Sequence, residues 1–300
     1  MLVTGSHRSG TTWIGRNLAS APQTAYIHEP FNIGFRISVT GGQMNNWFQY
    51  ICEENSEQFK TKVDNVVEYR YPLLANLSNS RTVRDLGKIL RDLGITLLNK
   101  IKGNTPIIKD PIAFFSAEWL SKTYEADVLV AIRHPAAFCS SLKIKNWKFD
   151  FNNFLSQPLL MESYLGDYEE DIRKFAQEEQ DIIDQAILLW NCIYHTADVY
   201  QQKHPDWIFV RHEELSMDPI KHFKSIYRNL DLEFTTQVKS DIVERSGSHN
   251  PKEQHSEDEF KRDSKANIKN WKNRLTKKEI DRIRVKTNKV SNIFYDNDDW

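Results

Sequence analysis

Residues 2–13 read LVTGSHRSGTTW. The apolar start predicts a short strand over 2–5, and residues 11–19 predict a helix, with a glycine loop between them. A strand, a glycine loop and a helix in this order direct several backbone N–H groups, together with the positive end of a helix dipole, toward one point. The stretch therefore predicts a phosphate-binding loop in an α/β protein.

This loop differs from the phosphate loop of nucleoside triphosphatases, G-x-x-x-x-G-K-[ST], at one decisive position. Thr11 stands where that motif has the lysine that reaches the β- and γ-phosphates. No predicted strand ends in a convincing Mg²⁺-binding aspartate either. A Walker-type ATPase is therefore disfavoured, and a plain tight turn between strand and helix is the alternative to a phosphate site.

Apolar strands and helices alternate along the rest of the chain. Further strands are predicted at 106–109, 127–132 and 207–211. Helices are predicted at 84–100, 113–123, 135–143, 172–203, 219–230 and 276–288. Segment 36–80 is predicted to be irregular, and 245–266 to be a polar surface loop. The alternation predicts an α/β fold, a single domain over residues 1–300 with a mainly parallel central sheet flanked by helices.

Charged residues gather where the predicted strands end. Lys109, Arg133 and Arg211 each close a strand, as Gly5 does before the loop. Ligands of parallel α/β sheets bind outside the carboxyl ends of the strands. The pattern therefore predicts an anion site at that edge.

Composition narrows the class of protein. The 300 residues carry a formal net charge of −1, which gives no support to a general nucleic-acid or membrane-surface binder. Cys52, Cys139 and Cys192 lack metal-binding spacing and predict reduced thiols in a cytoplasmic protein. No run of 18 apolar residues occurs, so no membrane-spanning segment is expected.

A second candidate anion site lies in AIRHPAAFCSSLK, residues 131–143. Arg133 ends a predicted strand, and Ser141 follows eight positions later on the next helix. An arginine at the edge of a sheet and a nearby serine can converge on one phosphate. The alternative is an arginine paired with a carboxylate and a buried helical serine.

The loop GSHRSGTTW resembles that of the 3′-phosphoadenosine-5′-phosphosulfate (PAPS)-dependent sulfotransferases. Many cytosolic members have lysine in place of Arg8, and the arginine is similar to the bacterial, Golgi carbohydrate and tyrosylprotein branches. The resemblance implies a P-loop-NTPase-like sulfotransferase fold, PAPS as donor, adenosine 3′,5′-bisphosphate as product, and no metal. It places adenine near Trp13. It also implies that the 5′-phosphosulfate is wrapped by Arg8, Ser9, Gly10, Thr11 and Thr12.

Three other segments extend the resemblance. Arg133 and Ser141 match the spacing of the family's 3′-phosphate site. FVRHEELSMDP is similar to a strand followed by Y-E-D, which puts His212 near adenine. SKANIKNWKNRLT, residues 264–276, resembles the C-terminal R-K-G-x-x-G-D-W-K-N segment, with Lys265 at the lysine position. Ser264, Ala266 and Lys269 depart from that pattern, and Arg262 is a possible substitute for the missing arginine.

Sulfuryl transfer needs an acceptor in line with the leaving phosphate, positive charge on that phosphate, and a base. Arg8 and Lys109 are the predicted leaving-group cations. Glu29, in YIHEPF, is the favoured base, since the segment resembles one that holds the presumed base of carbohydrate sulfotransferases. Two other candidates for the base are Asp110 and His28. Asp110 lies near the sequence position at which cytosolic members of the family have a histidine base.

The acceptor is the least determined part of the prediction. Segments 44–50 and 145–154 are rich in aromatic residues, which would either stack on sugars or belong to the core. The HEPF and KDPIAFFSAEWL patterns resemble bacterial enzymes of surface polysaccharide or glycolipid modification, which implies a carbohydrate hydroxyl, or else an amine, as acceptor. A small-molecule kinase with a degenerate phosphate loop and a non-catalytic nucleotide-binding protein remain alternatives.

Overall fold

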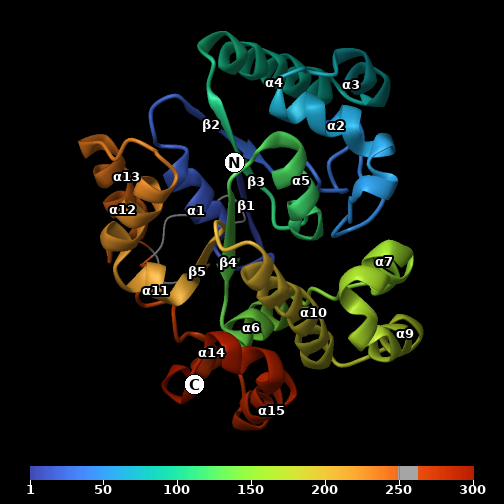
Figure 1. Ribbon diagram of the computed structural model, residues 1–300, viewed down its shortest axis with the longest axis vertical. Coiled ribbons are helices and arrows are strands. Elements are labelled where there is room, and N and C mark those ends of the chain that lie inside the picture. The colour runs from blue at the N-terminus through green and yellow to red at the C-terminus, as the bar shows by residue number, and fades with distance from the viewer. Residues whose placement is uncertain (249, 251–262) are drawn as a thin grey trace.

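The computed structural model describes residues 1–248, 250 and 263–300. Within them, parallel strands form a five-stranded sheet in the order β2-β3-β1-β4-β5 (Figure 1). The strands are β1 (Leu2–Gly5), β2 (Thr24–His28), β3 (Thr105–Lys109), β4 (Val128–Ile132) and β5 (Ile208–Arg211). Their carboxyl ends therefore share one edge, as predicted.

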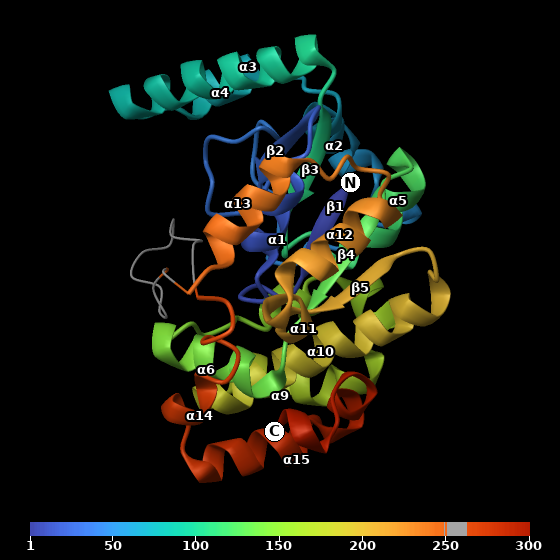
Figure 2. The ribbon, with the colours of Figure 1, turned by 90° about the vertical axis from the view of Figure 1, so that its left-hand side faces the viewer.

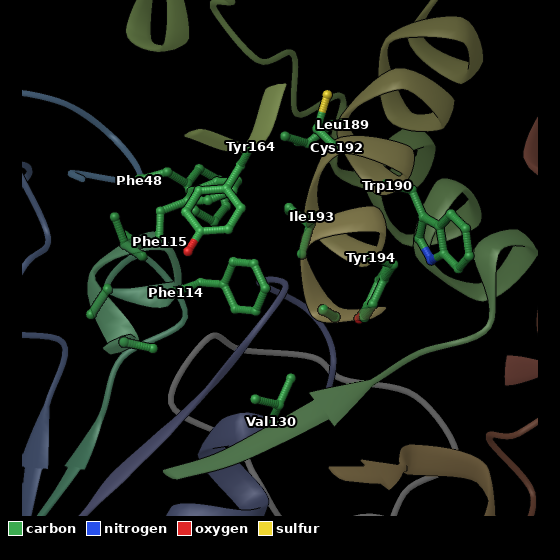
Figure 3. Packing of buried hydrophobic residues seen from close by; sticks show 14 of the residues in the cluster. Phe48, Phe114, Phe115, Val130, Tyr164, Leu189, Trp190, Cys192, Ile193 and Tyr194 are labelled. Atoms are coloured by element: carbon green, nitrogen blue, oxygen red, sulfur yellow. The ribbon is translucent and has the colours of Figure 1, made fainter. Parts of the chain in front are cut away.

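Helices cover both faces of the sheet. On one face lie α1 (Thr11–Leu18), α11 (His212–Met217), α12 (Pro219–Asn229) and α13 (Thr236–Ser246). On the other lie α5 (Ala117–Tyr124), α6 (Pro135–Lys145), α10 (Ile182–Lys203) and α15 (Lys277–Phe294). Strand residues alternate between two cores, so that Leu129 faces α12 while Val130 faces α10. Figure 3 shows the larger core, where Phe114, Phe115 and Tyr164 pack beside Ile193.

The strands and most helices predicted from the sequence are confirmed, but several predicted segments are wrong. Segment 36–80 is not irregular throughout, because it contains α2 (Glu57–Val67) and α3 (Leu73–Asn79). The helix predicted over 172–203 is two helices, α9 (Glu169–Gln177) and α10. Asp181 caps the start of α10 by accepting a hydrogen bond from the amide of Ile183 at 3.0 Å, which restarts the helix.

Other boundaries shift modestly. The helix α4 (Val83–Lys102) and the helix α15 are longer than predicted, and α13 extends into the predicted 245–266 loop. Of that loop, residues 249 and 251–262 lie outside the described residues. The remaining short elements are α7 (Asn152–Leu155), α8 (Pro158–Leu160), α14 (Trp271–Arg274), η1 (Glu53–Asn55), η2 (Phe114–Ser116), η3 (Met161–Leu165), η4 (Gly166–Tyr168) and η5 (Asn297–Asp299).

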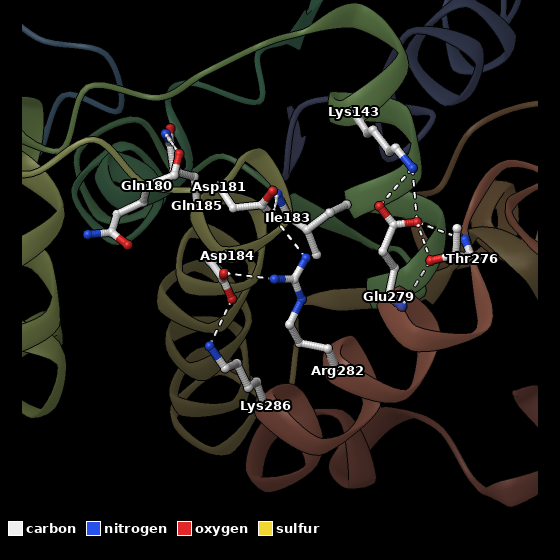
Figure 4. Close-up of polar contacts among 10 residues, drawn as sticks. All are labelled: Lys143, Gln180, Asp181, Ile183, Asp184, Gln185, Thr276, Glu279, Arg282 and Lys286. Atoms are coloured by element: carbon white, nitrogen blue, oxygen red, sulfur yellow. Dashed lines mark hydrogen bonds and ion pairs between the residues drawn. The ribbon is translucent and has the colours of Figure 1, made fainter.

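Ion pairs fasten α15 to the body of the molecule (Figure 4). Arg282 contacts Asp181 and Asp184 at 2.9 and 3.0 Å. Lys143, on α6, contacts Glu279 at 2.7 Å. This places the C-terminal helix against α6, which carries Ser141. No helix in the described ranges is long and apolar enough to cross a membrane.

Candidate active site

The glycine loop joins β1 to α1 and needs glycine at both ends. Gly5 has φ +130° and Gly10 has φ +85°. A Cβ on Gly5 would lie 2.3 Å from the carbonyl oxygen of Ala131, and one on Gly10 would lie 2.3 Å from Cδ2 of His212. No other residue type fits these conformations and approaches without displacement of the neighbours.

The loop leaves backbone donors available. The helix α1 starts at Thr11 without a side-chain cap. In the part of the chain that the structure describes, the amides of Gly10, Thr11 and Thr12 have no acceptor. The hydroxyl of Ser9 is used within the loop, where it donates to the carbonyl of Ser6 at 2.5 Å. Open amides at the positive end of a helix dipole are the elements of an anion site.

Arg8 connects this loop to the second predicted motif. Its Nε donates to Oγ of Ser141 at 2.9 Å, although the two residues lie 133 positions apart. Its carbonyl oxygen accepts a hydrogen bond from the guanidinium of Arg133 at 2.8 Å. The fold thus brings the two motifs into one cluster.

Arg133 is held at the end of β4 by its own backbone. Its amide donates to the hydroxyl of Tyr194 at 3.0 Å, and its carbonyl accepts from Nε1 of Trp190 at 2.9 Å. Burial lowers the pKa of Arg133, and the carboxylate of Glu213 only partly offsets that effect. Its buried Nε has no acceptor among the described residues. A buried donor without an acceptor is costly, so a ligand oxygen would fit here.

Lys109 and Glu29 form an ion pair at the ends of neighbouring strands. His28 and Lys109 are partners in the register of β2 and β3, so Glu29 follows directly beside Lys109. The lysine is 1% exposed and the glutamate 18%. Burial lowers the pKa of Lys109 despite the glutamate beside it. Burial raises the pKa of Glu29, but Lys109, His28 and a hydrogen bond from Asn32 bring it below its ordinary value.

Asp110 is fully buried and serves the backbone. Its Oδ2 accepts from the amide of Phe31 at 2.6 Å, and Oδ1 accepts from Ile112 and Ala113 at 2.9 and 3.3 Å. Burial raises the pKa of Asp110 to about 7. Both oxygens of this carboxyl group therefore hold the backbone of the turns that follow Glu29 and Asp110.

His28 adjoins the ion pair on its exposed side. Its Nδ1 lies 3.2 Å from the hydroxyl of Tyr26, and its Nε2 lies 4.0 Å from Oε2 of Glu29. The His28 side chain is 46% exposed. It lowers the pKa of Glu29 through its charge when protonated, but it is not within hydrogen-bond distance of that carboxylate.

The residues predicted near adenine lie together beside the loop. Trp13 is buried, with its ring edge-on to Phe223 at 5.3 Å and to His212 at 6.0 Å between centroids. Its Nε1 has no acceptor within the described ranges. His212 starts α11 and approaches Gly10 closely. The structure therefore places both rings at one side of the glycine loop, with Trp13 largely a core residue.

The C-terminal segment that carries Lys265 is anchored near these rings. Ser264 is buried, and its hydroxyl lies 3.2 Å from the carbonyls of Ser216 and Ser246, at the ends of α11 and α13. Lys265 itself is exposed. Trp271 stacks on the ring of His134, which follows Arg133, at 5.1 Å. Arg262 lies outside the described residues.

One aromatic segment borders the loop as well. The ring of His7 packs against Phe48, Phe138 and Trp147 at 5.8, 5.2 and 5.4 Å between centroids. Burial lowers the pKa of His7 to about 4. Phe48 is a core residue, whereas Trp147 is 44% exposed. The aromatic residues at 44–50 and 145–154 thus belong partly to the core and partly to the surface beside the loop.

Arg211 ends β5 as predicted but does not belong to this cluster. It pairs with Glu214 and Asp299 at 2.8 and 2.9 Å and donates to the carbonyl of Phe294 at 2.9 Å. Its role is to hold the C-terminus.

Two residues of the cluster, Tyr194 and Glu213, are not among the site residues predicted from the sequence. Tyr194 contacts the hydroxyl of Ser6 at 2.7 Å, and Glu213 accepts from the amide of His134 at 3.1 Å. Both lie in segments that the sequence predicts, the Y-E-D-like stretch for Glu213 and the helix over 172–203 for Tyr194, but the pattern assigns neither residue a contact.

Comparison with known proteins identifies the family. The model of the sulfotransferase family matches residues 1–236, so the chain belongs to the sulfotransferase family. The sulfotransferase domain of the Synechococcus PCC 7002 olefin synthase is 15% identical, with a TM-score of 0.51 over 98% of this chain and 94% of that one. The sulfotransferase domain from the curacin biosynthetic pathway is 13% identical, with a TM-score of 0.50 over 98% and 97%. These likenesses confirm the predicted fold. No curated protein matches the sequence significantly.

Proposed function

We propose that this member of the sulfotransferase family transfers the sulfuryl group of PAPS to a hydroxyl, or an amine, of a carbohydrate or glycolipid acceptor. The observation that supports this most is the cluster of Arg8, Arg133 and Ser141, which joins the glycine loop to the end of β4. The Lys109–Glu29 pair lies on the other side of the same loop, at the end of the β2–β3 pair.

The residues at this edge fit the donor. The amides of Gly10 to Thr12 and the dipole of α1 would hold the 5′-phosphosulfate. The unpartnered Nε of Arg133 and the hydroxyl of Ser141 would hold the 3′-phosphate. Further contacts are assigned to Ser9, Trp13, His212 and Lys265. When bound, PAPS supplies an activated sulfuryl group on a phosphate leaving group.

Cations in the site serve the leaving group. Arg8 carries its guanidinium within the loop, and Lys109 lies almost fully buried on β3, the strand that pairs with β1. Buried positive charge stabilises developing negative charge far better than charge in water does. In the free protein the ammonium of Lys109 is neutralised by Glu29. Donor binding would therefore draw Lys109 toward phosphate and loosen the carboxylate.

Glu29 is the proposed base. Its carboxylate is ionised at neutral pH, and the loosening of its ion pair with Lys109 on donor binding would make it a stronger base for the acceptor's proton. The rival Asp110 has both oxygens on backbone amides, which disfavours that role. The exposed ring of Trp147, beside the loop, is the proposed contact for a sugar face.

Donor binding is tested by thermal shift with adenosine 3′,5′-bisphosphate against ATP with Mg²⁺. At about a hundredfold excess over Kd, a bound ligand stabilises the fold by roughly 2.7 kcal/mol. We expect a shift with the bisphosphate that Arg133→Ala abolishes and that Arg228→Ala, on the exposed side of α12, preserves. A shift with ATP alone would favour the kinase. Bisphosphate binding without transfer of labelled sulfate to any oligosaccharide or glycolipid would favour a non-catalytic protein.

A further inference from the structure

The helix α4 presents an apolar surface that the fold does not cover. We call the α4 apolar face the exposed side chains of Val83, Leu86, Leu90, Leu97 and Ile101. Their spacing of three, four or seven residues puts them on one side of a helix. Val83, Leu90 and Ile101 are 86%, 68% and 83% exposed. The face runs about 27 Å along the helix, at 1.5 Å per residue.

The opposite side of α4 attaches the helix to the molecule. Ile89 and Thr96 are its buried residues. Lys88 donates to the carbonyl of Ile37 at 2.6 Å, and Asp85 pairs with Arg36 at 2.7 Å. Figures 1 and 2 show α4 beside α3 at one end of the molecule. The helix is thus held in place with its apolar face outward, and α3 adds Leu74, which is 82% exposed. Contiguous exposed apolar surface of this kind marks an interaction site.

The helix that carries the α4 apolar face is also positively charged. The helix α4 has five basic residues and two acidic ones, a formal charge of +3. Both acidic residues are already paired, Asp85 with Arg36 and Asp92 with Arg91. The exposed cations Arg84, Lys100 and Lys102 make no ion pair within the described residues. Ile95 and Leu98, 52% and 51% exposed, lie outside the α4 apolar face on the same helix, so exposed apolar and basic side chains also mix beyond that face. A basic helix with exposed apolar side chains fits the surface of an anionic membrane.

A second copy of the chain is the competing occupant. Gly87 and Gly94 lie along α4 with nothing within 4 Å of an added Cβ, and small residues permit close packing of another helix. However, two copies of α4 would bring a charge of +3 against +3, and like charges disfavour that pairing. Anionic lipid headgroups complement the same charge.

We propose that α4 docks this protein on the surface of an anionic lipid bilayer, with its apolar face inserted and its cations at the headgroups. The net charge of −1 for the whole chain hides this local excess of positive charge. The proposal does not rest on the proposed function, because vesicle binding needs neither donor nor acceptor. If the acceptor is a glycolipid, docking would bring the enzyme to it.

Sedimentation with vesicles tests the proposal. The wild-type protein should bind phosphatidylglycerol–phosphatidylcholine vesicles and not phosphatidylcholine alone, and binding should fall as salt is raised. Leu90→Gln with Ile101→Gln should lower the partition coefficient by roughly tenfold per residue or more. Arg84→Gln with Lys102→Gln should lower it and reduce its salt dependence.

Matched substitutions on α15 provide the controls. Val285 and Ile293 are 69% and 49% exposed on that helix, and their change to glutamine should leave binding unaltered. Lys277→Gln with Lys278→Gln controls for loss of charge. Wild-type protein that fails to bind anionic vesicles, or binding that the Leu90 and Ile101 substitutions leave intact, overturns the proposal. A wild-type dimer in sedimentation equilibrium that those substitutions dissociate, without vesicle binding, would assign the face to a second copy.

Discussion

At the scale of single residues, the candidate site contains buried charged side chains that are neutralised by an ion pair or hydrogen-bonded to the backbone. Lys109 is 1% exposed, yet Glu29 beside it keeps the pair balanced. Asp110, next in sequence to Lys109, is engaged by three backbone amides and fixes the turn that carries Glu29. Adjacent charged residues thus have different roles, and their hydrogen-bond partners decide which of them can act on a substrate.

Replacement of Glu29 separates chemistry from donor binding. A positioned base contributes about 10²–10⁴-fold in rate, so Glu29→Gln should lower kcat by that factor. The Kd for adenosine 3′,5′-bisphosphate should stay equal or decrease, since Lys109 is released from its ion pair. The matched control is Glu53→Gln, which removes the carboxylate of the exposed pair with Lys122 and should change neither quantity. Near-full activity of Glu29→Gln would exclude it as the base.

The pH dependence of the reaction should also distinguish Glu29 from Asp110 as the base. The pKa of Glu29 in the folded protein lies below its ordinary value of 4.5 because of Lys109, His28 and Asn32. A base must be ionised, so kcat/KM should hold through neutral pH and decline only as the pH falls through the lowered pKa of Glu29. Rates at acid pH that begin to fall near pH 6 to 7 would instead point to Asp110, whose pKa is raised to about 7.

At the scale of elements, the strand–loop–helix unit of β1 and α1 works through close approaches that glycine permits. Gly10 starts α1 in the left-handed region, and the ring of His212 from α11 lies against it. Gly5 brings β1 against β4, next to the strand end that carries Arg133. The two ends of the loop are therefore packed closely against β4 and α11.

Substitution of Gly10 should damage the donor site. In Gly10→Ala the alanine has to adopt φ +85° and displace His212. The backbone conformation alone should lower the free energy of unfolding by about 1–2 kcal/mol. The distorted loop should bind the bisphosphate at least tenfold more weakly. Gly94→Ala is the control. That glycine lies inside α4 with open space around it, so alanine should stabilise the fold by roughly 0.5–1 kcal/mol. Calorimetry and chemical unfolding measure both effects, and unchanged bisphosphate affinity in Gly10→Ala would argue against this site.

At the scale of the whole molecule, the C-terminus supports the site from behind. His134, which follows Arg133, is enclosed by the rings of Trp271, Tyr295 and Trp300. Tyr295 also donates to Glu213 at 3.0 Å, and Glu213 accepts from the amide of His134. Arg211 holds Asp299 at 2.9 Å in the same region. Residues of α14 and of the chain after α15 therefore pack around the end of β4.

Loss of Trp300 should open this enclosure. Burial lowers the pKa of His134 from 6.5 to about 3, so the folded state holds it neutral and loses stability as the pH falls from 6.5 toward 3. Trp300→Ala should raise that pKa, reduce the slope of stability against pH in this window, and weaken bisphosphate binding through Arg133. Nuclear magnetic resonance titration of the imidazole and thermal unfolding measure these changes. Ile293→Ala, exposed on α15, should alter none of them.

Much of the architecture could be predicted because it depends on local pattern. Continuous apolar runs mark β1, β3, β4 and β5. Of these strands, β1 and β4 are fully buried, whereas β5 lies at the edge of the sheet and is half-buried. The edge strand β2, TAYIH, is not among the predicted strands, although it is as long as β3. Helix α2 buries Phe59, Val63 and Val66 at helical spacing, a signal that the prediction of an irregular segment overlooks, whereas α3 buries Asn76 and lacks such a period.

The sequence by itself determined the strand–loop–helix unit, the parallel sheet and the family, because glycine spacing and apolar period constrain the backbone directly. Only the tertiary structure decided which charges share a site. Arg211 ends a strand like Arg133 but turns to the C-terminus, while Tyr194 and Glu213 reach the end of β4 from helices α10 and α11. These contacts join residues far apart in the sequence. They depend on how the helices pack on the sheet, which the residues next to each of them in sequence do not indicate.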